Sequence, residues 1–106
     1  MAVCSIVTFR IRPGRMADWL SNTATAKSAL ERHGAKVRIW QAFTGNDPGL
    51  SATLVAEFDD MESYGRITEA LSQDSEWRDF QQARQSETIP AATLTSRNLV
   101  TEITTI

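Results

Sequence analysis

The sequence predicts a single α+β domain whose elements follow the order βαββαβ. Four runs rich in β-branched and aromatic residues alternate with two segments in which apolar residues recur at helical spacing. The two helical segments also begin alike, with Met16-Ala-Asp-Trp-Leu20 in the first and Met61-Glu-Ser-Tyr-Gly65 in the second. A doubled βαβ unit explains both the order and the likeness.

The composition fits one globular domain over residues 1–106. A chain of 106 residues can bury a core without disulfides, and a single cysteine excludes an intrachain disulfide. The net charge of −2, with acids and bases intermixed, argues against nucleic-acid and membrane partners. No run approaches the ~20 apolar residues of a membrane span. No signal peptide is readable either, so we expect a cytoplasmic protein.

The first strand and helix are expected over Val3–Ile11 and about Arg15–Arg32. Alternation along the strand places Val7 and Phe9 on one face and the single cysteine on the other. Gly34 suits the position after the helix, where a left-handed conformation is cheap only for glycine. The expected helical stripe facing the sheet consists of Met16, Trp19, Leu20, Thr23, Lys27 and Leu30, with Ala24 and Ala26 beside it.

A hairpin follows, with strands over Val37–Phe43 and Ser51–Phe58 and a turn over residues 45–49. Asp59-Asp60 then caps a second helix, whose expected stripe is Met61, Tyr64, Thr68 and Leu71. The period breaks at residues 72–75, so a kinked or two-part helix is expected, with Asp74 or Ser75 as a second cap. Its second half carries Trp77, Phe80 and Arg84 and ends near Ser86.

The last strand is expected over Thr93–Ile103 with strict alternation of its two faces. Right-handed crossovers then give a four-stranded antiparallel sheet with both helices on one face, the ferredoxin-like plan. Large apolar residues occur on both faces of the strands, as Ile39 and Trp40 illustrate. Because a monomer would expose one of these faces, we expect a homodimer through the open sheet face.

The chain resembles the dimeric α+β barrel superfamily, and within it the NIPSNAP-type and antibiotic-biosynthesis-monooxygenase-like small domains. The resemblance implies that two ferredoxin-like subunits pack their sheets into a barrel. It covers almost the whole chain through short motifs in the right order. These are Phe9-Arg-Ile-Arg-Pro-Gly-Arg15, Val37-Arg-Ile-Trp-Gln-Ala42, Asp59-Asp-Met-Glu-Ser-Tyr64, Asp74-Ser-Glu-Trp77 and Thr95-Ser-Arg-Asn-Leu99.

The resemblance implies less about function, because the superfamily contains monooxygenases, haem-degrading enzymes, peroxidases, isomerases and non-enzymatic members. Haem-degrading members use an Asn on the first strand and a His on the second helix. This chain has neither, which argues against haem oxygenation. No cofactor is therefore expected.

Two single residues invite a catalytic interpretation that the sequence does not favour. His33 is the only histidine and falls in the last turn of the first helix, where a partly charged imidazole suits the helix dipole. No second histidine or further cysteine exists to share a metal, so no metal site is expected. Cys4 lies among apolar strand residues and is interpreted as a small buried hydrophobe.

The ligand-pocket candidates are mid-strand and helix residues that combine charge or hydroxyl groups with aromatic surface. An arginine facing a barrel interior can bind a carboxylate or enolate, and a tryptophan can stack on a planar molecule. The alternative is that these side chains pack the dimer or reach the rim, with Arg38 pairing with Glu57. The candidates are Thr8, Arg38, Trp40, Trp77 and Arg97.

Two functions remain open on the sequence alone. The first is a dimeric barrel without defined activity that binds a small, partly apolar ligand or a protein partner. The second is a cofactor-free monooxygenase or isomerase acting on an activated aromatic or polyketide-like substrate, with its pocket between the helices and the sheet. A pair of polar groups converging in an apolar pocket would favour the second.

Overall fold

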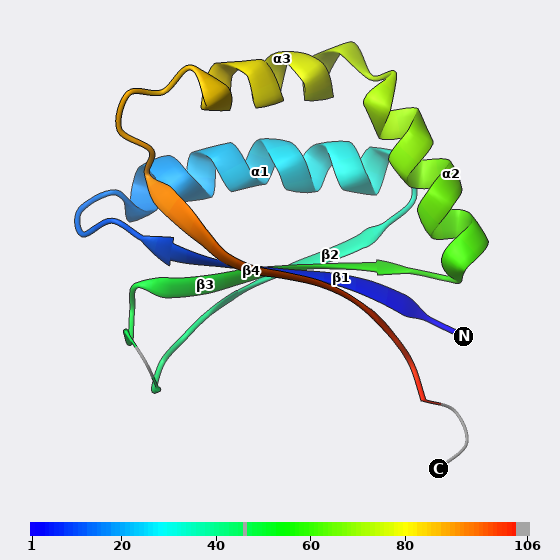
Figure 1. Ribbon diagram of the computed structural model, residues 1–106, viewed down its shortest axis with the longest axis horizontal. Helices are drawn as coiled ribbons and strands as arrows, with labels where there is room; N and C mark the ends of the chain where they lie inside the picture. The colour runs from blue at the N-terminus through cyan, green and yellow to red at the C-terminus, as the bar shows by residue number, and fades with distance from the viewer. Residues whose placement is uncertain (46, 104–106) are drawn as a thin grey trace.

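The computed structural model describes residues 1–45 and 47–103 and confirms the ferredoxin-like plan. The elements are β1 Val3–Ile11, α1 Met16–Arg32, β2 Lys36–Gln41, β3 Ser51–Phe58, α2 Met61–Ser72, α3 Ser75–Gln85 and β4 Ala92–Thr101. The strands form one antiparallel sheet in the order β2-β3-β1-β4. All three helices lie on one side of it (Figure 1). Within the described chain, no helix is long and apolar enough to cross a membrane.

The helix ends show why the chain turns where it does. Gly34 has φ +108, and the amides of Gly34 and Ala35 donate to the carbonyls of Glu31 and Leu30, a Schellman ending for α1. The carboxylate of Asp60 accepts a hydrogen bond of 2.7 Å from the amide of Ser63 and caps α2. Both features follow the sequence-based expectation.

The hairpin is shorter than the sequence suggested. β2 ends at Gln41, and the amide of Gly49 donates to the carbonyl of Ala42 at 2.9 Å, so the loop already begins there. Phe43 therefore lies outside the sheet and is 93% exposed. Asn46, part of the expected turn, lies outside the described residues.

The expected strict alternation of the last strand is wrong because β4 contains a bulge. Thr8 pairs with Ser96 but the next residue, Phe9, pairs with Leu94, so Thr95 is the extra residue. The hydroxyl of Thr95 donates to the carbonyl of Thr8 at 3.1 Å. As a result Leu94 and Arg97 both face the helices, although strict alternation would separate them.

The core occupies the space between the helices and the sheet and is divided into two clusters. One joins α1 and α2 to β2 and β3 around Leu30, Phe58 and Ile67. The other lies at the start of α1, around Phe9, Ile11 and Trp19. The helical stripes are confirmed in part, because the expected positions Trp19, Thr23, Leu30 and Leu71 are buried. They differ from expectation because Leu20, Met61 and Thr68 are exposed, Lys27 pairs with Glu31 at 3.0 Å, and Ala29 and Ile67 are buried instead.

The other face of the sheet is open and mixed in character. Ile6 and Val55 lie at its centre, and Trp40 on β2 is 57% exposed. Hydroxyl and charged side chains surround them, so this face is more polar than the sequence led us to expect. Its remaining strand residues are Cys4, Thr8, Arg10, Lys36, Arg38, Ser51, Thr53, Glu57, Thr93, Ser96, Asn98 and Val100.

Candidate functional site

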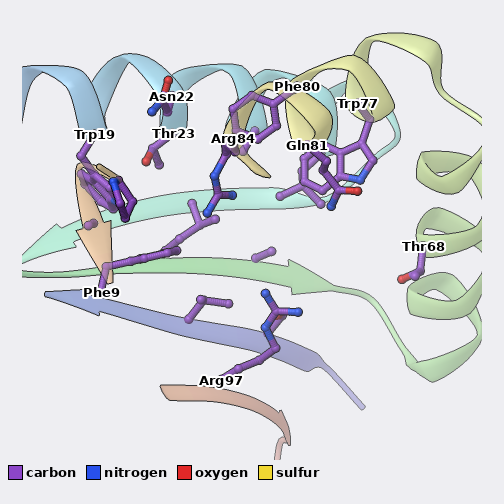
Figure 2. Close-up of a pocket in the computed structure, with 18 of the residues that line it drawn as sticks. Phe9, Trp19, Asn22, Thr23, Thr68, Trp77, Phe80, Gln81, Arg84 and Arg97 are labelled. Carbon is purple, nitrogen blue, oxygen red and sulfur yellow. The ribbon is translucent and has the colours of Figure 1, made fainter. Parts of the chain in front are cut away.

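A cleft of about 490 Å³ lies between α1, α3 and the helix-facing side of the sheet (Figure 2). Its volume falls in the range of about 300–1,000 Å³ usual for small-molecule sites. The cleft exists for two reasons. In Figure 1, α3 lies farther from the sheet than α1, and α3 contributes no fully buried residue. The middle of the space is also lined by small side chains, namely Ser5, Thr23, Ala26 and Ala56.

Aromatic side chains line both ends of the cleft. At one end Phe9 meets Trp19 edge to face, with ring centroids 5.6 Å apart. At the other end Trp77 and Phe80 of α3 lie 5.7 Å apart, each half-buried. Such rings offer flat apolar surface at small entropic cost, so the cleft is suited to a planar, partly apolar molecule.

Two arginines bring positive charge into this apolar space. Arg84 reaches in from α3 and Arg97 from β4, and Figure 2 shows both guanidinium groups pointing into the cleft from opposite walls. The Cζ atom of Arg84 lies 5.5 Å from the centroid of the Phe80 ring, a cation–π arrangement. Among the described lining residues only Glu87 carries a carboxylate. The site therefore has an excess of positive charge.

The start of α3 is held to the end of α1 by Asp74. One carboxylate oxygen accepts hydrogen bonds from the amides of Glu76 and Trp77, at 3.0 and 3.2 Å, and caps α3. The other lies 2.7 Å from a guanidinium nitrogen of Arg32 and 2.8 Å from Nε2 of His33. These bonds, that of Arg32 foremost, hold the pKa of Asp74 well below its usual range. The wall that carries Trp77 is thus positioned by a charged cluster.

The loop between α3 and β4 closes the end of the cleft near Trp19. Pro90 and Ala91 line the cleft, and Ala91 is buried. The guanidinium of Arg12 donates to the carbonyl of Pro90 at 3.2 Å, which ties this loop to the turn before α1. Arg15 also donates to the carbonyl of Ile89 at 3.4 Å, so two side chains anchor the loop to that turn.

The structure divides the five sequence-based candidates between two faces. Trp77 and Arg97 line the cleft. Thr8, Arg38 and Trp40 lie on the open face instead, because strand alternation points them away from the helices. The five residues therefore do not form one site. The prediction of a pocket between the helices and the sheet is wrong for Thr8, Arg38 and Trp40.

On the open face, Thr8 contacts a residue of the neighbouring strand, whereas Arg38 lacks the ion pair expected from the sequence. The hydroxyls of Thr8 and Thr53 lie 3.2 Å apart across the β1–β3 pair. Glu57 lies opposite Lys36, and no ion pair joins it to Arg38 among the residues that the structure places. The pairing of Arg38 with Glu57 suggested by the sequence is therefore not formed.

The single cysteine and histidine lie away from the cleft. Burial raises the pKa of the Cys4 thiol, and Glu57 and Glu102 raise it further, so the thiol stays protonated near neutral pH. His33 is half-buried at the end of α1 and contacts Asp74. Over residues 1–45 and 47–103, no group of three His, Cys, Asp or Glu side chains is arranged to hold a metal ion.

Sequence reasoning did not assign several of the cleft residues to a site. Trp19, Thr23 and Ala26 belong to the α1 stripe and were expected to pack directly on the sheet. Arg84 follows Trp77 by seven residues and Phe80 by four, a spacing that places all three on one helical face. That spacing was the available signal, but it does not reveal that α3 stands away from the sheet.

Comparison with protein families agrees with this architecture. The family model described as NIPSNAP matches residues 4–96, which is most of the chain. The chain belongs to the NIPSNAP family. No match was found among curated protein sequences.

Solved structures of NIPSNAP proteins share the fold. An uncharacterized NIPSNAP domain protein from Burkholderia xenovorans superposes with a TM-score of 0.71 at 16% identity, covering 98% of this chain and 97% of that one. A NIPSNAP family protein from Agrobacterium tumefaciens gives 0.68 at 14% identity, with 99% and 89% coverage. SnoaB, a cofactor-independent oxygenase from Streptomyces nogalater, gives 0.65 at 17% identity, with 99% and 96% coverage. At these identities the likeness concerns the fold alone.

Proposed function

We propose that this NIPSNAP protein binds a small, partly apolar molecule in the cleft between α1, α3 and the sheet. The observation that carries the proposal is a cavity of about 490 Å³ walled by aromatic rings and entered by two arginines. A cavity that only reflected loose packing would be lined by apolar groups throughout. Here aromatic and aliphatic side chains combine with polar ones such as Asn22, Gln81 and the two arginines, so the cleft can both bury and hydrogen-bond a ligand.

Tryptophan fluorescence and thermal shift together test the proposal. Trp19 and Trp77 line the cleft, whereas Trp40 lies on the open face. The substitution Trp40→Phe therefore removes tryptophan fluorescence that comes from outside the cleft. A panel of flavins, haem and small aromatic acids is titrated into this variant. A ligand at a hundred times its Kd stabilises the fold by about 2.7 kcal/mol, or roughly 10 °C in Tm. If no member changes either signal, the binding proposal fails.

A second candidate function is cofactor-free oxygenation or isomerisation of an activated aromatic or polyketide-like substrate. It is favoured by the shared fold with SnoaB together with the aromatic cleft. The ionisable groups among the described residues that line the cleft, apart from the two arginines, are Tyr64 and Glu87. With so few acid–base groups, the substrate would have to supply most of the reactivity, so binding ranks first.

Oxygen uptake distinguishes the two functions. An anthrone can react with O₂ to give the quinone and water, one oxygen atom entering the substrate and the other leaving as water. An enzyme would accelerate this uptake, and Arg97→Gln and Trp77→Phe would reduce the acceleration. Binding of the anthrone without acceleration would support the binding function and exclude this reaction.

We also propose that the protein is a homodimer that buries the open sheet face. Support comes from the apolar residues Ile6, Val55 and Trp40 on that face and from the position of all three helices on the other side (Figure 1). The simplest cover for this face is the same face of a second copy, which gives a symmetric contact. The polar residues on this face predict a partly hydrated interface.

A further inference from the structure

We propose that Arg84 and Arg97 together bind the anionic group of an aromatic ligand, so that the cleft selects planar aromatic carboxylates over neutral molecules of the same shape. This inference rests on the small-molecule binding proposed above and adds the charge of the ligand to it.

The first support is where the two side chains come from. Arg84 belongs to α3 and Arg97 to β4, elements that form opposite walls of the cleft. Figure 2 shows each guanidinium reaching inward from its wall. Arg97 faces the helices because it pairs with Val7, a buried residue on the helix-facing side of β1. Two guanidinium groups that point into one cleft are suited to binding an anion between them.

The second support is the lack of a carboxylate partner. Some arginines of the molecule pair with carboxylates, as Arg15 does with Asp18 at 2.6 Å and Arg32 with Asp74 at 2.7 Å. No ion pair of the described residues includes Arg84 or Arg97. Their N–H groups can therefore donate to a ligand, and a guanidinium is suited to bidentate binding of a carboxylate.

The third support is the surroundings of the arginines. The Phe80 ring holds the Arg84 guanidinium in place at 5.5 Å. Trp77 and Trp19 stand toward the two ends of the same cleft and offer surface for a planar body. An aromatic ligand would therefore place its rings among the tryptophans and its anionic group between the arginines.

A matched pair of probes separates charge from shape. 2-Naphthoate and 2-naphthamide have nearly the same size and differ in one negative charge. Titration calorimetry with each at pH 7 measures the ratio of their dissociation constants. We expect naphthoate to bind about tenfold more tightly or better, the effect of one or two charge-assisted hydrogen bonds.

Substitutions then locate the preference. Arg84→Gln and Arg97→Gln are each expected to lower the affinity for naphthoate about tenfold while leaving that for naphthamide nearly unchanged. Arg97→Lys keeps the charge and should retain part of the preference. Arg78→Gln is the matched control, because Arg78 lies on the same helix as Arg84 but does not line the cleft. Thermal unfolding of each variant checks that it is folded.

The outcomes separate the inference from the function on which it rests. Equal binding of naphthoate and naphthamide would leave the cleft a ligand site and overturn the role of the two arginines. A preference for naphthoate that survives both Arg84→Gln and Arg97→Gln would also overturn it. Binding of neither probe, in calorimetry and in thermal shift, would count against both the inference and the proposed ligand site.

Discussion

Nε2 of His33 lies 2.8 Å from Oδ2 of Asp74, which joins the last turn of α1 to the first turn of α3. The same carboxylate caps α3 and contacts Arg32. The position of α3 decides the shape of the cleft, since Trp77, Phe80 and Arg84 all belong to it. The contact between His33 and Asp74 lies outside the cleft, yet it positions the helix that forms one wall of the cleft.

Replacing Asp74 is expected to destabilise the fold and to weaken ligand binding. Asp74→Ala removes a helix cap, leaves His33 without its carboxylate and leaves Arg32 only its 3.4 Å contact with Glu76, so Tm should fall by roughly 5 °C or more. Thermal unfolding followed by circular dichroism measures this. Asp59→Asn is the control, because Asp59 is exposed and the cap of α2 is supplied by Asp60. Equal Tm values for the two variants would contradict the role given to Asp74.

The contribution of Asp74 should also depend on pH. Its pKa is lower in the folded protein than the value of about 4 in the unfolded chain. Its stabilisation is then fully present above pH 4 and is lost as the pH falls toward the folded pKa. The difference in Tm between wild type and Asp74→Asn should shrink when the pH is lowered from 6 to 3. A difference that stays constant over this window would argue against a charged role.

Filling the cleft should stabilise the protein while blocking it. Ala26 is 7% exposed and lines the cleft, so Ala26→Leu places its extra carbons in empty space. We expect the free energy of unfolding to rise by about 1 kcal/mol and ligand affinity to fall. Ala35 packs in the core cluster around Leu30 and does not line the cleft, so Ala35→Leu should cost about 1–3 kcal/mol. Urea unfolding measures both, and equal losses of stability would mean that the space beside Ala26 is not available.

The open face should control the oligomeric state. The chain mass is 11.8 kDa, so analytical centrifugation of the proposed dimer should give a molecular mass about twice as large. Val55→Lys introduces a charge at the centre of the face and should give a monomer. Phe43→Lys is the control, because Phe43 is exposed outside the sheet. A wild-type monomer at micromolar concentration would disprove the dimer.

The thiol of Cys4 should react slowly with iodoacetamide. Its pKa is raised, so less thiolate is present at pH 8 than for an ordinary cysteine. The rate should increase on unfolding in urea and should increase in the native protein when the pH exceeds 9. Mass spectrometry follows the single alkylation. A native rate as fast as the unfolded rate at pH 8 would show that the thiol is not shielded.

The order and limits of the elements could be read from the sequence because they depend on local chemistry. β-Branched alternation marked β1 and β3 to the residue, and Asp60, Asp74 and Gly34 marked helix ends through hydrogen bonds within a few residues. The end of β2 was missed, because the bond from Gly49 to Ala42 spans the whole loop. The same local pattern placed Arg38 and Trp40 on one face of their strand but did not show which face the helices cover.

The sequence by itself determined the fold class and the separation of strand faces, since these follow from periodicity and capping. The NIPSNAP resemblance rested on short motifs in the right order. Only the tertiary structure decided where a cleft exists. It arises because α3 stands away from the sheet over small side chains at Ala26 and Ala56, a relation between distant segments. That Arg84 and Arg97 line the same cleft was decided at the same level, because one belongs to α3 and the other to β4.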